Sequence, residues 1–481
     1  MSRINTNVSS LVSVRVLNSN NANLQTSLQR LSTGYRINSG KDDPAGLIAS
    51  ETLRAEQRST EVAISNAQRA DNIIGTAEGS LGEISNLLVS MQGLVGNAAN
   101  KAGLSQDERD ANQLQVDSIL STINRISNSA SFQGAKLLNG TFDYTTSGLA
   151  TTSAFTSVSI NSAKVGSTTL SVTVAVIASA QTGQLNFAGS SAGLSGTASI
   201  SLAGNKGTVQ LSFASATKSS AIVASVNQFT DSTGIQAKLS SDSKSVKFTS
   251  TGYGASQFVS INSNNTSAFA TKDTSGVTNT NDAGRNATVT VNGTAVQSNG
   301  LNVKVVTANF EADLTLNSTV NTVGKSKAFG ITGGGATFSL GAQVNTANTA
   351  SIGLGNVNTS SIGKYVDNGT VHSLSDLGSG KAAAVNNGDT TLAQNIVNEA
   401  IKNVAGVRGR LGAFQKNVIG STINSLNVAL ENVSSSNSAI RDTDFATETA
   451  NLTRSQILVQ AAGSVLSQAN SSPQSVLRLL G

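Results

Sequence analysis

Apolar positions at both ends of the chain follow helical spacing. Over residues 4–35 they recur at steps of three, four and seven, which places them on one stripe of a helix. Residues 452–469 carry a second stripe at alternating steps of three and four, with an adjacent row beside it. The first segment is rich in Asn and Ser, which weaken a helix, so it needs a packing partner. We therefore expect the ends to pack together, and against copies of themselves, through Ile4, Val8, Leu11, Leu24, Leu28, Leu31, Leu452, Leu458, Val459, Val465 and Leu466.

A turn and a much longer helical pattern follow the first stripe. Gly34 and Gly40, together with Asp42, Asp43 and Pro44, have turn chemistry. Residues 47–100 then predict one helix of about 80 Å. Its apolar positions keep a four-three alternation over more than four heptads, which is specific for coiled-coil-like packing. The large members of this seam are Ile74, Leu81, Ile84, Leu88 and Met91.

The middle of the chain changes character. Ser105 and Glu108 fit a capping box that begins a second helix, which ends near residue 128. Residues 141–387 are dominated by Ser, Thr, Gly, Asn and Val with alternating apolar positions, which predicts one or two β-rich modules. Residues 198–248 read as a β-β-α-β-β unit. The order along the chain is thus helical, β-rich, helical.

A returning helix begins at Asp389 or Thr390. Its stripe includes Leu411, Phe414 and Val418 and then shifts phase at residue 423. Residues 434–445 predict a polar break, and the C-terminal helix is expected to be interrupted near Pro473. The two helical parts match in length and break position, so we expect an α+β fold: a long antiparallel helical coiled-coil hairpin formed by both termini, with β-rich outer domains inserted in the middle.

Composition narrows the function. The 481 residues predict about two to four domains, and the 4% aromatic content without Trp favours elongated or layered packing. A dispersed net charge of +5 gives no indication of nucleic-acid binding. The sequence contains no run of about 18 apolar residues, so membrane insertion is not expected. Residues 1–10 lack the layout of a cleaved secretory signal. The chain is therefore expected in the cytoplasm or on an export route without a cleaved signal peptide.

Catalytic chemistry has little support. The chain has no Cys, which excludes thiolate catalysis and zinc-thiolate sites. His372 is the only histidine and lies in a Gly/Asn-rich segment, so a nucleophilic triad or a two-histidine metal site is not expected. We predict no enzyme activity, no cofactor and no metal.

Several motifs resemble those of bacterial flagellins. The N-terminal ones are INTNV at residues 4–8, LSTGYRINS at 31–39 and DDPAG at 42–46. The C-terminal ones are RLGAFQ at residues 410–415, DTDFA at 442–446 and SQIL at 455–458, followed by Ala469 and Asn470. The resemblance covers roughly residues 1–140 and 390–481, on both arms and in the right order.

The resemblance implies a three-part subunit. Residues 1–46 and 435–481 would form inner-tube helices, with Asp42, Asp43 and Pro44 in the spoke that joins the two tubes. Residues 47–145 and 330–434 would form an outer-tube helical domain with a small β part. Residues 146–329 would form a solvent-exposed β-rich insertion.

In function, the resemblance implies a subunit that polymerises into the helical flagellar filament used for motility. It would be exported unfolded by the flagellar type III apparatus, with an export chaperone, and would reach the extracellular filament. Its partners would be copies of itself, the filament cap and the hook-junction proteins. The alternative is a hook–filament junction protein with the same terminal scheme, although the long arms and the match at residues 455–470 favour the filament subunit. A surface adhesin or secreted enzyme with a helical stalk would need a signal peptide or a catalytic cluster.

One departure from the family pattern concerns immune recognition. Flagellins detected by the mammalian Toll-like flagellin receptor carry Arg, Arg and Glu at three outer-tube positions. These positions align with Ser90, Gln92 and Gln115 of this chain. Because charge is lost at all three, we expect weak receptor activation.

Overall fold

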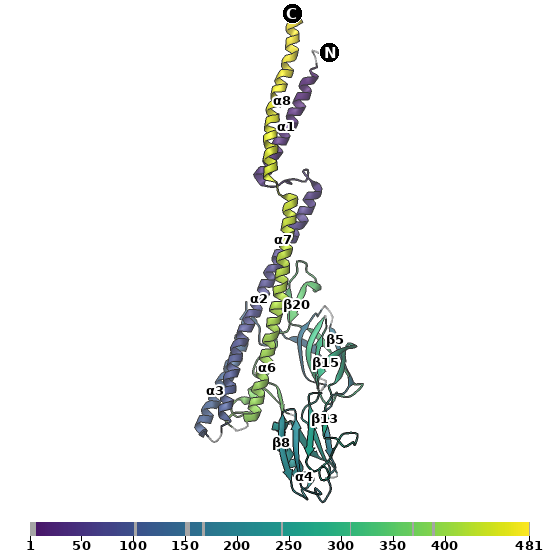
Figure 1. Cartoon of the computed structure of the whole chain (residues 1–481). Helices are drawn as coiled ribbons and strands as arrows, with labels where there is room; N and C mark the ends of the chain where they lie inside the picture. Colours follow the sequence, from purple (N-terminus) through teal and green to yellow (C-terminus); the bar gives the residue numbers. More distant parts are fainter. Residues whose placement is uncertain are drawn as a thin grey trace. The chain divides into compact units, whose positions relative to one another are not determined.

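The computed structural model describes residues 6–100, 103–149, 154–165, 169–241, 244–307, 309–367, 370–386 and 390–480. It contains two compact units. One comprises Met1–Asp71, Ser339–Thr349 and Lys416–Gly481, and the other comprises Asn72–Phe338 and Ala350–Gln415. Helices dominate both ends of the sequence and strands dominate its middle (Figure 1). The predicted α+β class is confirmed.

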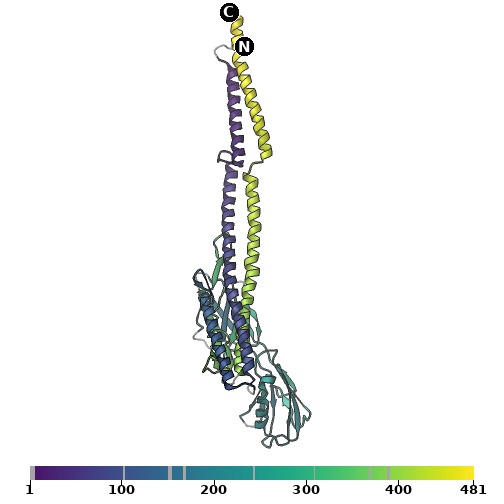
Figure 2. The same ribbon diagram turned by 90° about the vertical axis from the view of Figure 1, so that its left-hand side faces the viewer.

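The terminal helices α1 (Val8–Thr33) and α8 (Phe445–Leu480) lie side by side in the first unit (Figures 1 and 2). Asn7 caps the start of α1, because its side chain accepts a hydrogen bond from the amide of Ser10. Gly34 ends the helix at φ 76°, a left-handed conformation that suits glycine. Ile4 lies outside the described residues.

The long predicted helix is α2 (Pro44–Ala98). Pro44 occupies its first position, where a missing amide hydrogen costs nothing. Every large member of the predicted seam has essentially no exposed surface: Ile74, Leu81, Ile84, Leu88 and Met91.

Helix α3 (Gln106–Ser129) begins at the predicted capping box. The amide of Ser105 donates to Glu108 at 2.7 Å, and the amide of Glu108 donates to the Ser105 hydroxyl at 3.3 Å. Buried Gln113 fixes α3 to the segment that precedes the returning helix. It donates to the Leu377 carbonyl and accepts from the Val385 amide, both at 2.8 Å.

The returning helix contains a π-helical turn. It comprises α6 (Thr390–Phe414), η3 (Gln415–Gly420) and α7 (Ser421–Arg441). A π-turn accommodates one extra residue, which explains the phase shift that the sequence shows. It buries Ile419 fully, whereas the predicted Val418 is half-exposed. Asp389, the first of the two candidate caps, lies outside the described residues.

Two predicted breaks in the C-terminal part are wrong. The polar stretch at 434–445 is helical as far as Arg441, because its Ser and Asn residues line exposed faces of α7, and the real break is residues 442–444. Helix α8 continues through Pro473 without interruption. Pro473 has no amide hydrogen to donate to the Ala469 carbonyl. That carbonyl accepts a hydrogen bond from the side chain of Asn7 at 2.7 Å instead.

An eight-stranded antiparallel sheet forms the first β-rich part of the second unit. Its order is β3-β18-β5-β14-β15-β16-β17-β4. Cross-strand pairs such as Val289 with Val296 and Val303 with Leu314 set the register of its buried face. The bounds are β3 (Tyr144–Ser147), β4 (Phe155–Ala163), β5 (Leu170–Ala178), β14 (Thr288–Val291), β15 (Thr294–Asn299), β16 (Asn302–Val306), β17 (Phe310–Leu316) and β18 (Ser326–Gly334).

A separate module is inserted between β5 and β14. It consists of two four-stranded sheets, β12-β6-β10-β9 and β13-β11-β7-β8, with α4 (Ser219–Asn227) and the short α5 (Thr230–Thr233). Its own core stacks Phe187 on Phe269 at 4.2 Å between ring centroids. The strands are β6 (Gln184–Phe187), β7 (Ala198–Gly204), β8 (Gly207–Phe213), β9 (Ile235–Leu239), β10 (Val246–Ser250), β11 (Phe258–Ser263), β12 (Thr271–Lys272) and β13 (Asn281–Ala283).

The predicted β-β-α-β-β unit is present as β7, β8, α4, β9 and β10, although its two hairpins belong to different sheets. The chain enters and leaves the module through one neck, where Gln181 and Arg285 form an antiparallel bridge with N···O distances of 2.8 and 3.0 Å. The β-rich part contains two hydrophobic cores, one in the eight-stranded sheet and one in the inserted module. The boundaries at 146–329 stay a prediction, since strands of the sheet begin at Tyr144 and end at Gly334.

Short elements complete the chain. They are β1 (Ser131–Phe132) with β2 (Ala135–Lys136), β19 (Ala336–Ser339) with β20 (Thr349–Ile352), β21 (Tyr365–Asp367) with β22 (Thr370–His372), and the 3-10 turns η1 (Thr346–Asn348) and η2 (Leu374–Leu377). Within the described ranges, no helix has the length and apolar character needed to cross a bilayer.

Candidate self-assembly surface on the terminal helices

The seam between α1 and α8 alternates small buried side chains with larger half-buried ones. Ser13 and Ser27 of α1, and Ser455 and Ala462 of α8, are only 5–9% exposed. Larger residues at the alternate heptad position of the same seam are half-buried: Leu17, Leu24, Leu31, Leu452, Val459 and Leu466. A seam of this kind brings the helices close while burying little apolar surface.

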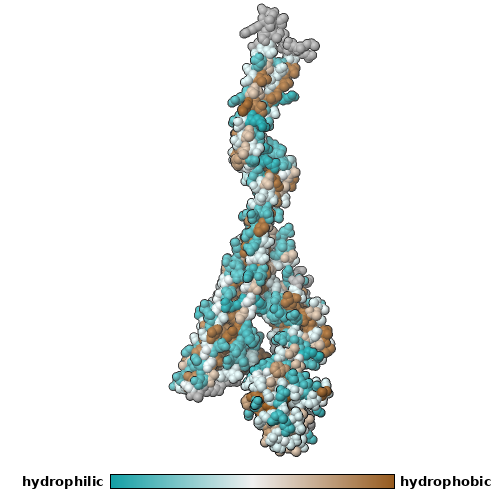
Figure 3. Space-filling view, in the orientation of Figure 1, coloured by the Kyte–Doolittle hydropathy of each residue, from teal (hydrophilic) through white to brown (hydrophobic). Residues whose placement is uncertain are grey.

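The larger apolar side chains lie mostly on other faces. In α1, Val8 is 61% and Leu11 is 63% exposed, and Val12 and Val16 are also exposed. These four residues are mostly spaced by three and four, so they share one broad face that lies beside the serine seam. Leu28 of α1 and Leu458 and Val465 of α8 are exposed as well. Figure 3 shows hydrophobic residues at the surface of the α1/α8 pair.

The sequence stripe therefore divides into two sets. Leu24, Leu31, Leu452, Val459 and Leu466 line the seam within the chain. Val8, Leu11, Leu28, Leu458 and Val465 face outward. The sequence analysis missed Val12, Val16 and Ile457, which are outward-facing too. Their spacing from Val8, Leu11 and Leu458 was the signal that could have found them.

Polar contacts tie α1 to α8 at intervals. Ser10 donates its hydroxyl to Asn470 at 2.7 Å, and the Asn20 amide group donates to the Leu458 carbonyl at 3.4 Å. At the other end of α1, Arg30 pairs with the buried carboxylate of Glu448 at 3.6 Å. These directional contacts complement a seam that has little apolar area.

The two connectors beyond these helices pair with each other. Tyr35 and Asp442 form an antiparallel bridge. The amide of Arg36 donates to the Arg441 carbonyl at 2.7 Å, and the amide of Thr443 donates to the Gly34 carbonyl at 2.9 Å. The Arg441 guanidinium lies 4.7 Å above the centre of the Tyr35 ring, a cation–π contact.

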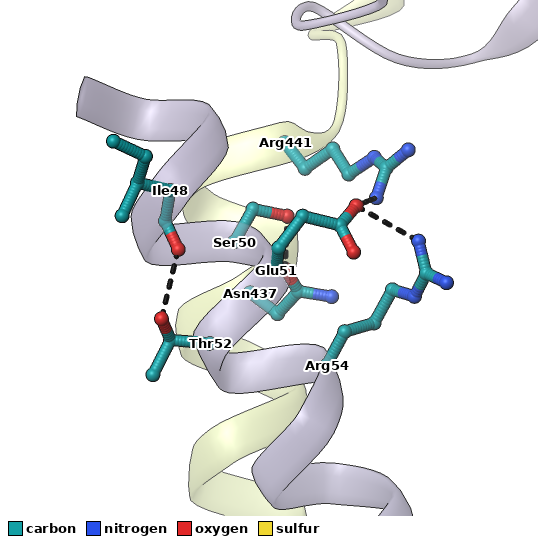
Figure 4. A network of polar contacts seen from close by, with 7 residues as sticks. All are labelled: Ile48, Ser50, Glu51, Thr52, Arg54, Asn437 and Arg441. Atoms are coloured by element: carbon teal, nitrogen blue, oxygen red, sulfur yellow. Dashed lines mark hydrogen bonds and ion pairs between the residues drawn. The ribbon is translucent and has the colours of Figure 1, made fainter. Parts of the chain in front are cut away.

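Figure 4 shows that Arg441 and its neighbours in α7 also contact residues of α2. Arg441 donates to Glu51 at 3.1 Å, and Arg54 donates to the same carboxylate oxygen at 2.9 Å. Ser50, which is fully buried, donates to the Asn437 side chain at 2.8 Å. The sequence does not predict the roles of Arg441 and Glu51, because a single charged residue belongs to no periodic pattern that would indicate its partner.

The predicted spoke residues organise the tight turn that starts α2. Asp42 accepts from the amide and hydroxyl of Ser39, both at 2.8 Å, and these bonds hold the pKa of its carboxyl below the usual value. Asp43 accepts from the Gly46 amide at 2.9 Å and so caps the helix that Pro44 begins. The two carboxylates are thus engaged within the turn.

In the second unit, α2 and α6 are joined by polar pairs. Gln92 donates to Asn398 at 2.9 Å, and Arg408 donates to Glu78 at 2.7 Å. Leu411 is buried and Phe414 is half-buried near Phe338, at 6.2 Å between ring centroids. Ser90 and Gln115, the other two residues of the predicted receptor footprint, are exposed on α2 and α3.

Arg410 of the RLGAFQ motif reaches from α6 to the eight-stranded sheet. Its guanidinium donates to Asn161 of β4, and Asn161 donates to Asp313 of β17 at 2.9 Å. Burial lowers the pKa of Arg410, while the nearby carboxylates of Asp313, Glu311 and Asp143 oppose this shift. The arginine therefore anchors the helix to the sheet by a charge-assisted chain of bonds.

Within the described ranges, no three His, Cys, Asp or Glu side chains gather as a metal site would require. His372 ends β22 and lies 3.6 Å from Asp376, a local pair within a single turn.

Comparison with known proteins identifies the family. Models of the bacterial flagellin N-terminal and C-terminal helical regions match residues 4–143 and 394–480. Flagellin D of Vibrio anguillarum is 30% identical, and Flagellin B of the same species is 31% identical, each over 99% of both chains. The chain belongs to the bacterial flagellin family. As a flagellin it is a structural subunit of the flagellar filament, and the relatives that match its full length carry that name rather than the junction protein's.

Solved structures give weaker likenesses. FliC from Burkholderia pseudomallei is 17% identical with a TM-score of 0.23, over 72% of this chain and 98% of that one. The flagellar junction protein FlgL from Legionella pneumophila is 12% identical with a TM-score of 0.28, over 82% and 99%. At these scores neither comparison bears on the choice between filament and junction.

Proposed function

We propose that this flagellin polymerises through the outward apolar faces of α1 and α8. The observation that supports the proposal is the distribution of side chains: the seam within the chain uses one set of apolar residues, and a second set, which includes Val8, Leu11 and Val465, stays exposed outside it. Contiguous exposed apolar surface in a soluble protein marks an interaction site. A filament also needs contacts between two different faces of neighbouring copies, and two helices with separate apolar faces supply them.

The free energy of burying these side chains is large enough to order the terminal helices when copies of the chain cover them. Full burial of one Val or Leu side chain contributes about 1.5–3 kcal/mol. Val8, Leu11, Val12 and Val16 share one face of α1, so covering that face offsets the ordering entropy of a helix that is weak alone. We infer that the terminal helices gain most of their stability in the filament.

Seeded elongation tests this proposal. The double variant Leu11→Ser, Val12→Ser should raise the critical concentration for elongation on wild-type seeds more than tenfold, because two apolar contacts are lost. Val306→Ser is the matched control, since Val306 is equally exposed on β16 but lies outside the terminal helices; it should change the value less than twofold. Equal effects of the two changes would contradict the proposal.

We further propose the tube assignment that the family resemblance implies: inner-tube helices at 1–46 and 435–481, and an outer-tube part that includes the seam of α2 and α6. If the inner-tube part depends on assembly, limited trypsin digestion of the monomer should remove both ends and spare residues 47–434. The same digestion of filaments should leave the ends intact. Full protection of the monomer's ends would contradict this assignment.

The remaining partners are proposed on the same ground. They are the type III export apparatus with its chaperone, the filament cap and the hook-junction proteins, with the filament as the extracellular destination. In a strain without the cap protein, the chain should accumulate unpolymerised in the medium. Deleting the export apparatus should abolish that accumulation, and continued release would refute the proposed route.

A further inference from the structure

Helix α8 contains a proline well inside its bounds. Pro473 has no amide hydrogen, so the carbonyl four residues earlier, that of Ala469, lacks the usual α-helical donor. Polar backbone groups in folded proteins almost always find another partner. The sequence holds only two prolines, and the other starts α2, so this irregularity occurs at one place along α8.

The partner of that carbonyl comes from α1. The side-chain amide of Asn7 donates to the Ala469 oxygen at 2.7 Å. The oxygen of the same side chain accepts from the Ser10 amide at 3.0 Å and caps α1. A primary amide can donate and accept at once, so one side chain satisfies the free donor of one helix and the free acceptor of the other.

We propose that Asn7 is the positioning residue that sets the register of α1 against α8 during assembly. The seam itself specifies register weakly, because its buried members are serines and an alanine and its Leu and Val members are only half-buried. A single polar residue can fix helix register at such a seam. If α1 slid by one turn, Asn7 would meet a carbonyl that already accepts from its own helix, and the Ala469 carbonyl would lose its donor.

A second contact between the helices provides a contrast. The amide group of Asn20 donates to the Leu458 carbonyl at 3.4 Å. No proline follows Leu458 by four residues, so that carbonyl keeps its helical donor, the amide of Ala462. Losing the Asn20 donor should therefore leave no carbonyl without a partner.

The inference rests on the proposed role of α1 and α8 in polymerisation, and seeded elongation tests it. Asn7→Asp keeps the cap, since Asp caps as well as Asn, but removes the donor to Ala469. Its critical concentration should rise about tenfold, the size expected for a polar group left unpaired on burial. Asn20→Asp introduces the same charge on the same helix and should raise it less than threefold.

Pro473→Ala supplies the decisive comparison. It restores an amide hydrogen for the Ala469 carbonyl, so in this background Asn7→Asp should cost less than threefold. Equal penalties for Asn7→Asp and Asn20→Asp, or an Asn7→Asp penalty that is unchanged by Pro473→Ala, would overturn the inference. Failure of the wild-type chain to elongate would contradict the proposed function instead. Hydrogen–deuterium exchange of the α8 amides in the full chain then decides the contact: faster exchange in Asn7→Asp than in Asn20→Asp supports it, and equal exchange overturns it.

Discussion

Charged residues in the family motifs of this flagellin make specific hydrogen bonds. Asp42 and Asp43 look like a solvated acidic pair in the sequence, yet one closes a turn on Ser39 and the other caps α2 through Gly46. The motif residue Arg410 likewise anchors a helix to a sheet through Asn161. Charged residues in the family motifs are thus explained by hydrogen-bond partners, some in the same turn and one on a distant strand, that the sequence only suggests.

Immune recognition is a prediction at this scale. The family resemblance aligns the receptor-active Arg, Arg and Glu with Ser90, Gln92 and Gln115, and we therefore predict that reporter cells carrying the Toll-like flagellin receptor respond weakly. The triple change Ser90→Arg, Gln92→Arg, Gln115→Glu should raise potency at least tenfold by restoring charge-assisted contacts.

The control for this prediction is Gln394→Glu. Gln394 is an exposed helical glutamine like Gln115, so the substitution makes the same charge change on α6. It should leave potency unchanged. A wild-type chain already as potent as a receptor-active flagellin would show that the footprint has been misplaced.

Among the secondary-structure elements, the returning helix shows what a periodic pattern can and cannot give. The sequence predicts both helical segments and the phase shift between Val418 and Ile423, but not the π-turn that absorbs it. The break before α8 was predicted too long, because exposed Ser and Asn side chains in α7 have the composition of a loop. Pro473 likewise predicts an interruption that the structure does not have. The hydrogen bond that Pro473 cannot give to the Ala469 carbonyl comes from Asn7, more than 460 residues away. Sequence periodicity identified the seams, whereas long-range polar partners required the structure.

Two matched deletions test the π-turn. Removing Asn417 takes the extra residue out of η3, so α6 and α7 would continue as one α-helix with their buried faces in phase. Removing Asn427, an exposed residue of α7, would rotate the following turns by about 100° and expose the half-buried stripe.

Thermal unfolding followed by circular dichroism should therefore separate the two deletions. The Asn417 deletion should melt within about 3 °C of the wild type, and the Asn427 deletion should melt at least 5 °C lower, as expected for about 1–2 kcal/mol. Equal losses would mean that the π-turn does more than absorb an extra residue.

At the scale of the whole molecule, the most informative feature is the neck that connects the inserted module to the rest of the chain. The module has its own core, and the chain crosses the neck as a hydrogen-bonded pair, Gln181 and Arg285. Bridged residues lie about 5 Å apart, a gap that a short loop can close. The sequence indicated β-rich modules but could not show two separate cores, because alternating strands look alike in either one.

Replacing residues 182–284 by a four-residue Gly/Ser loop should leave the eight-stranded sheet intact and preserve seeded elongation within about threefold. The excised residues 182–284, produced alone, should unfold cooperatively, because Phe187, Phe248 and Phe269 all belong to that core. Loss of the sheet in the shortened chain, measured by far-UV circular dichroism, would show that the two cores depend on each other.

The neck also bears on how such a chain can evolve. Whatever lies beyond the Gln181–Arg285 pair can be lengthened, exchanged by recombination or lost, provided that its two ends meet at neighbouring positions. Under the proposed role of the terminal helices, selection for polymerisation acts on the two ends of the gene and leaves the inserted segment free to change. The Gln181–Arg285 bridge marks the boundary between these two parts of the coding sequence.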